Sequence, residues 1–277
     1  MAPRPGLARR SFGFLAPTFR FWMRTEVHVY AFSVAANVLL SFFPFLIVSI
    51  SLSGKVFGQF NAPAAIDLAL KDYFPSELGQ FLHNNLPLYH PPQVISILLL
   101  LFTSNGIFEP LEVALNHVWG IRKNRSFLRN QAVSLTLIFA CGGLALFSLW
   151  LGGVGQQTSR GGRIEVWISA LVFKVASVPI MALILFLVYR FLPNGRPPLA
   201  RIIPAAVGVG LLFEVLKGVN TFFWPRLESN IVREYGVFSH SVTLIFLAFL
   251  SSMLFLAGAE WAARGHRMDQ PLEKKGE

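Results

Sequence analysis

The sequence contains few charged residues. Asp, Glu, Lys and Arg make up 14% of its 277 residues, whereas a soluble domain usually carries about 25%. Hydrophobic residues make up 54% of the chain. These charged residues are too few to cover the surface of a soluble globular domain in the usual way, which argues against that class of protein. The length and composition indicate one integral membrane domain.

Cysteines and enzyme motifs are also scarce. The single cysteine, Cys141, lies inside an apolar run, so no disulfide within the chain can form. The six histidines are scattered without a pair at metal-binding spacing, and no GxSxG, Walker or CxxC motif occurs. The sequence therefore predicts no cofactor and no metal site, and it argues against an enzyme without excluding one whose groups come from distant helices. In particular, the sequence lacks the cluster of metal ligands that ribonucleases commonly use for phosphodiester hydrolysis.

Long apolar runs are abundant. A spanning helix needs about 20 mainly apolar residues, and six windows meet or approach that length. The six predict an all-α, polytopic membrane helix bundle with short amphipathic helices in the external loop 53–93. They are Val27–Leu52, Val94–Trp119, Ala132–Gly153, Val166–Phe191, Ile202–Trp224 and Val237–Trp261.

The basic residues divide unequally between the two sides of this bundle. Sixteen of the 24 Lys and Arg residues lie in the N-terminal segment, the loops after the second and fourth windows, and the tail. Basic residues collect on the cytoplasmic side, so both termini are predicted to be cytoplasmic. This divides the chain into a basic interfacial segment (1–26), a six-helix domain (27–262) and a cytoplasmic tail (263–277). The net charge of +10 is spread among loops, which argues against nucleic-acid binding.

Polar side chains also occur deep inside three of the windows. Charges near the bilayer centre are costly and usually face an interior or a wet cavity. In the second window they are spaced four, three and four residues apart, which places them on one stripe of a helix. Two interpretations remain open, a shared polar pathway and simple hydrogen bonding between helices. The pathway would be formed by Asn37, Ser41, Asn105, Glu109, Glu112, Asn116, Glu214 and Lys217.

Several segments together resemble the YihY/BrkB family of bacterial inner-membrane proteins. The segments are Ser41–Leu46, Gly106–Ile121, Leu192–Asn194, Pro204–Ala206, Tyr235–Phe238 and Gly258–Trp261. The resemblance implies six helices, a bacterial inner-membrane location, and a role in transport or export with links to envelope lipids and virulence. It also implies that the ribonuclease label attached to the family is a misassignment. Pro110 departs from the small or aromatic residue that is common there.

Three functions are consistent with these patterns. The first is a transporter or exporter of an envelope-lipid-related substrate, in which Glu109 and Glu112 bind a cationic group or proton and Glu214–Lys217 orients the substrate. The second is a scaffold whose basic loop 122–129 recruits envelope-assembly partners. The third is a lipid-modifying enzyme acting at Glu109 and His117. Expected partners are membrane lipids and, in addition, a second copy of the chain or assembly proteins.

Overall fold

The computed structural model describes residues 16–56, 94–122, 125–158 and 178–269, and within these ranges it is helical without strands. The predicted all-α fold is therefore confirmed. The helices are a short one over residues 16–22, then α2 (Thr25–Val56), α5 (Val94–Trp119), α6 (Phe127–Thr158), a helix over Val178–Phe191, α8 (Leu199–Tyr235) and α9 (Ser239–Asp269). A short 3₁₀ turn, η1 (Gly236–Phe238), joins α8 to α9.

Each of the six predicted windows coincides with a helix wherever the structure describes it. By length and composition, three helices of the described ranges can cross a membrane, through Thr25–Phe42, Leu199–Trp224 and Ser239–Arg264. The helix over Val178–Phe191 is apolar but shorter in these ranges. A membrane protein is thus supported, while the count of six spans stays a prediction. The predicted amphipathic helices of the external loop fall mainly on residues 57–93, outside the described residues.

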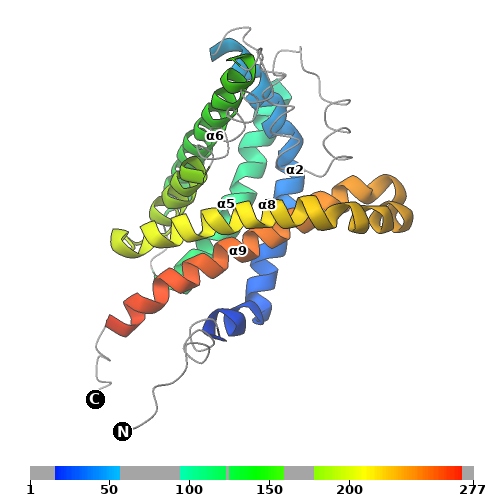
Figure 1. The fold of residues 1–277 in the computed structure, drawn as a ribbon. Coiled ribbons are helices and arrows are strands. Elements are labelled where there is room, and N and C mark those ends of the chain that lie inside the picture. Colours follow the sequence, from blue (N-terminus) through cyan, green and yellow to red (C-terminus); the bar gives the residue numbers. More distant parts are fainter. Residues whose placement is uncertain (1–15, 57–93, 123–124, 159–177, 270–277) are drawn as a thin grey trace, which may run out of the picture.

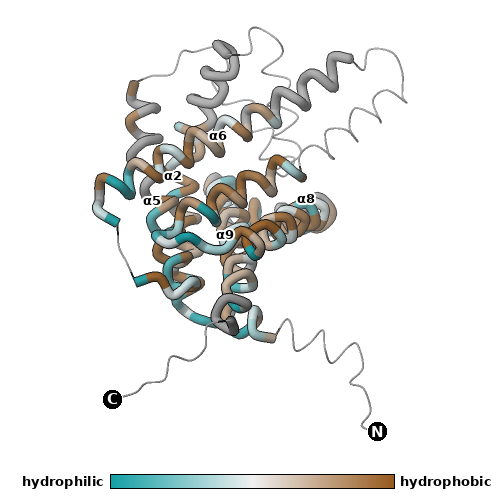
Figure 2. Tube along the Cα trace, turned by 90° about the vertical axis from the view of Figure 1, so that its left-hand side faces the viewer, coloured by the Kyte–Doolittle hydropathy of each residue, from teal (hydrophilic) through white to brown (hydrophobic). Residues whose placement is uncertain are grey.

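The helices form two groups that cross each other. In Figure 1, α2, α5 and α6 run side by side, and the hairpin of α8 and α9 lies across them. α9 connects the groups, since it packs against both α2 and α8, while α5 packs against α2 and α6. Figure 2 shows α8 and α9 as largely apolar segments, in keeping with their composition.

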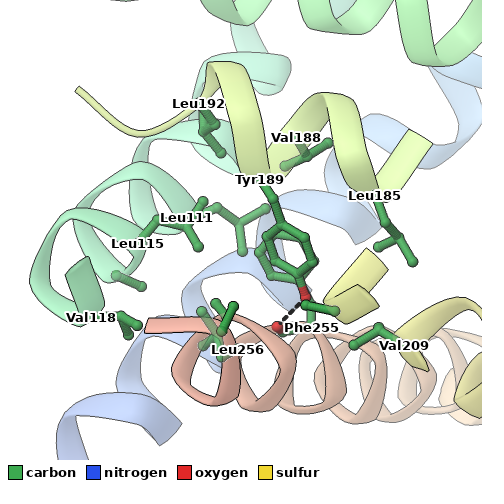
Figure 3. Packing of buried hydrophobic residues seen from close by; sticks show 14 of the residues in the cluster. Leu111, Leu115, Val118, Leu185, Val188, Tyr189, Leu192, Val209, Phe255 and Leu256 are labelled. Atoms are coloured by element: carbon green, nitrogen blue, oxygen red, sulfur yellow. Dashed lines mark hydrogen bonds between the residues drawn. The ribbon is translucent and has the colours of Figure 1, made fainter. Parts of the chain in front are cut away.

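The core lies where α5, α9 and the helix over Val178–Phe191 meet (Figure 3). Tyr189 is 2% exposed; its ring stacks on Phe255 with centroids 4.5 Å apart, and its hydroxyl donates to the Phe255 carbonyl over 2.6 Å. Small residues of α9 allow this close packing, as is usual between membrane helices. A Cβ at Gly258 would overlap with Val209 and lie 2.7 Å from the Tyr189 hydroxyl oxygen.

Glycines set two further close approaches. A Cβ at Gly106 of α5 would overlap with the side-chain amide of Asn37, so these two helices meet there with no space for a methyl group. At Gly210 of α8, a Cβ would lie 3.6 Å from the backbone nitrogen of Ala182. Gly218, eight residues further along α8, has nothing within 4 Å of a Cβ and sets no such approach.

The segments predicted to be cytoplasmic gather at one end of the molecule. The start of α2 and the end of α9 lie on the same side in Figure 1. The helix over 16–22 runs beside α9: Trp22 donates to the Met253 carbonyl over 3.0 Å, and Thr18 donates to Glu260 over 3.4 Å. Asn116 near the end of α5 accepts a 2.8 Å hydrogen bond from the Asn194 backbone. A shared end agrees with the charge pattern; its assignment to the cytoplasm stays a prediction.

Candidate functional site

A cavity of about 310 Å³ lies between α2, α8, α9 and the helix over Val178–Phe191. Its walls are mostly apolar, with Lys217 as the charged side chain and Ser251 and Ser252 as hydroxyls. We call it the Lys217 cavity. It is lined by Val38, Phe42, Met181, Phe213, Leu216, Lys217, Leu244, Leu247, Ala248, Ser251 and Ser252.

Lys217 forms an ion pair with Glu214, one turn earlier on α8, and the Lys217 Nζ lies 2.8 Å from the Glu214 Oε1. The two side chains are only 12% and 23% exposed, respectively. Pairing lowers the cost of holding charge among apolar residues, although desolvation still offsets much of the attraction. The predicted pair therefore exists, and it brings an ammonium group to the wall of an apolar cavity.

The polar residues of α2 are satisfied within their own helix. Asn37 donates to the Ser33 carbonyl over 2.8 Å, and Ser41 donates to the Asn37 carbonyl over 2.8 Å. Ser41 is 4% exposed, and neither residue belongs to the lining of the Lys217 cavity. These hydrogen bonds of Asn37 and Ser41 thus lie within one helix, and they support neither a shared polar pathway nor hydrogen bonding between helices.

The predicted stripe on α5 divides between two environments. Glu112 and Asn116 are buried, 6% and 8% exposed, and Asn116 accepts a hydrogen bond from the segment that follows the helix over Val178–Phe191. Glu109 is exposed, and the Asn105 side chain lies outside what the structure describes. None of the four lines the Lys217 cavity. The structure therefore does not bring the polar residues of α2, α5 and α8 into one cavity.

Arg125 makes a contact that the sequence did not predict. Its guanidinium donates to the carbonyls of Phe191, Leu192 and Pro193 over 3.2, 3.2 and 2.6 Å. These carbonyls end a helix and lack partners within it, so a cation there is favourable. Burial lowers the pKa of Arg125, while the negative charge of Glu112 raises it. Pro193, which cannot continue a helix, was the available signal for exposed carbonyls at this position.

A second cavity, of about 240 Å³, lies where the helix over 16–22 meets the ends of α5 and α9. We call it the interfacial pocket. Its walls are more polar than those of the Lys217 cavity and contain three arginines, one histidine and one glutamate. It is lined by Pro17, Arg20, Phe21, Arg24, His117, Val118, Glu260, Ala263 and Arg264.

The acidic groups at the interfacial pocket are already engaged. Glu260 pairs with Arg264, which also donates to the Thr18 hydroxyl. Glu26, at the start of α2, lies 3.6 Å from the His117 Nε2, and both side chains are exposed. His117, named in the third hypothesis, thus lies at the pocket beside an exposed carboxylate. No group of three or more His, Cys, Asp or Glu residues that could hold a metal ion occurs within the described ranges.

Comparison with known proteins places these features in a family. The chain is 25% identical over 245 residues to a UPF0761 membrane protein of Alcanivorax borkumensis, with 83% of this chain and 55% of the relative covered. A UPF0761 membrane protein of Chlorobium limicola is 26% identical, covering 85% and 54%. The chain thus spans about half the length of these relatives. The ribonuclease-like protein YfkH of Bacillus subtilis is 24% identical, covering 92% and 95%.

No solved structure matches the chain significantly. The family model described as virulence factor BrkB matches residues 18–277, which include every helix described above from α2 onward. This chain is a member of the BrkB family of membrane proteins.

Proposed function

We propose that the chain is a membrane transporter or exporter that holds an amphipathic, lipid-like substrate in the Lys217 cavity. The observation that supports this most is the composition of the cavity wall. An apolar lining with one ammonium group and two hydroxyls suits a molecule with an apolar body and one anionic group. A polar pathway for a small hydrophilic ion would need more polar groups along its wall.

The Glu214–Lys217 pair gives this site a way to bind and release charge. In the free site, the carboxylate of Glu214 neutralises the Lys217 ammonium. When substrate binds, its anionic group accepts hydrogen bonds from the same ammonium. The ammonium then remains partnered in both states, so binding does not leave an unpaired charge in an apolar cavity. Because Glu109 and Glu112 lie outside this lining, Lys217 replaces them as the residue to test first.

Lys217→Met should slow transbilayer movement of an anionic lipid at least tenfold, because the apolar side chain keeps the volume and removes the ammonium. The measurement uses proteoliposomes that contain acyl-labelled phosphatidylglycerol, with loss of fluorescence on addition of an impermeant quencher. It is run with and without an imposed proton gradient.

Arg233→Met is the matched control for this measurement. It removes one positive charge from the same helix, but Arg233 is exposed and lies outside the cavity. Its transport rate should stay within twofold of wild type. Equal rates for wild type and Lys217→Met, or no protein-dependent movement under either condition, would contradict lipid transport through this cavity.

A further inference from the structure

Two arginines of the interfacial pocket, Arg20 and Arg24, have no side-chain partner among the residues that the structure describes. Within the part of the chain that the structure describes, neither the Arg20 nor the Arg24 guanidinium has a hydrogen bond or an ion pair to a side chain. The carboxylates nearby are Glu260, which pairs with Arg264, and Glu26, which lies against His117. The pocket therefore carries positive charge that the described side chains do not neutralise.

The position of this pocket relates it to the membrane surface. One apolar stretch able to cross a membrane begins at Thr25, and another ends at Arg264. Arg24 and Arg264 thus stand at the ends of two such stretches. Basic side chains at such positions lie at the depth of the lipid headgroups.

We propose that the interfacial pocket binds a phosphate group, and that an anionic membrane lipid supplies it. Guanidinium groups bind phosphate oxygens through paired, charge-assisted hydrogen bonds, which suits Arg20 and Arg24. A volume of about 240 Å³ holds a phosphate group with several waters but not a whole lipid, so the acyl chains lie outside along the helices. Basic pockets between membrane helices bind lipid headgroups in this way. This site is separate from the Lys217 cavity and does not depend on the proposed transport.

Binding is measured on the full chain in a non-ionic detergent by thermophoresis. The three ligands are dioctanoyl phosphatidylglycerol, dioctanoylglycerol and glycerol 3-phosphate. The phosphate-bearing lipid should bind, and more weakly as the ionic strength rises. Dioctanoylglycerol, which has the same chains without phosphate, should bind at least tenfold more weakly, and glycerol 3-phosphate should bind more weakly than the lipid.

The Arg20→Gln/Arg24→Gln variant should weaken phosphatidylglycerol binding at least tenfold. Arg20→Lys/Arg24→Lys should fall between this variant and wild type, because lysine keeps the charge but not the paired donors. Arg129→Gln/Arg196→Gln is the control, since it removes two exposed arginines from the same end of the molecule but outside the pocket. Its affinity should stay within twofold of wild type.

Three results would overturn the assignment. Equal losses in the pocket and control variants would show that general charge, and not this pocket, holds the lipid. Equal binding of dioctanoylglycerol would remove the phosphate from the interaction. Glycerol 3-phosphate that binds as tightly as the lipid would assign the pocket to a soluble phosphate and not to the membrane.

Discussion

Arg125→Gln should lower the free energy of unfolding by about 3–5 kcal/mol. The variant loses three hydrogen bonds from a charged donor to the carbonyls of Phe191, Leu192 and Pro193. It also removes the cation near Glu112, whose Oε2 is buried and has no hydrogen-bond partner in the structure as described. A hydrogen bond from a charged donor contributes about 1.5–3 kcal/mol, and the partial exposure of Arg125 reduces the sum of the three.

The measurement is unfolding of the purified protein in mixed detergent micelles. Arg129 is an exposed neighbour in the first turn of α6, and Arg129→Gln should change the stability by less than about 0.5 kcal/mol. Glu112→Gln/Arg125→Gln should be more stable than Arg125→Gln alone, since an amide needs no cation beside it. An Arg125→Gln protein as stable as the Arg129→Gln control would show that the contact is not structural.

Gly258→Ala should destabilise the protein by about 1–3 kcal/mol, although alanine is the better helix former by about 1 kcal/mol. The added methyl group would overlap with Val209 and crowd the Tyr189 hydroxyl. Both neighbours are at most 3% exposed, and a β-branched valine has little rotamer freedom. The strain therefore falls on packing that cannot move away, and Gly258→Leu should be worse.

Gly143→Ala provides the comparison, measured by the same unfolding experiment. Gly143 is exposed on α6 with nothing within 4 Å of a Cβ, so alanine there should be neutral or stabilising by up to about 1 kcal/mol. Val209→Ala/Gly258→Ala should recover stability relative to Gly258→Ala, because the smaller side chain makes room for the methyl group. The same sign of effect at both glycines would contradict the packing described for α8 and α9.

The sequence was sufficient for the helices because membrane spans depend on local composition. Apolar windows such as Val94–Trp119 and Ala132–Gly153 lie within α5 and α6. The charge pattern also grouped the correct ends, as the contact between Asn116 and Asn194 and that between Thr18 and Arg264 show. Both signals act on stretches of chain and need no knowledge of which helices are neighbours.

The candidate site depends on which helices and side chains contact each other, and the sequence was less informative about these contacts. Spacing placed Glu109 and Glu112 on one stripe, but positions three residues apart differ by about 60° around a helix. That difference is enough to expose one carboxylate and bury the other. In the same way, the sequence used Arg24 for topology, and Arg125 for topology and as part of the basic loop 122–129. In the structure Arg24 lines a pocket, and Arg125 donates to three backbone carbonyls.

The account depends most on a lipid-like molecule entering the Lys217 cavity, and photo-crosslinking tests this directly. A phosphatidylglycerol with a diazirine on its acyl chain is incorporated in nanodiscs with the protein, irradiated, and its adducts are mapped by mass spectrometry. Phe222 and Val215 serve as internal references, because they are 67% and 60% exposed on α8 and lie outside the cavity.

The account predicts adducts on cavity residues such as Phe213 and Leu247, and their yield should fall several-fold in Lys217→Met while the yield at Phe222 stays constant. Adducts confined to exposed positions such as Phe222, or cavity adducts that do not depend on Lys217, would contradict it.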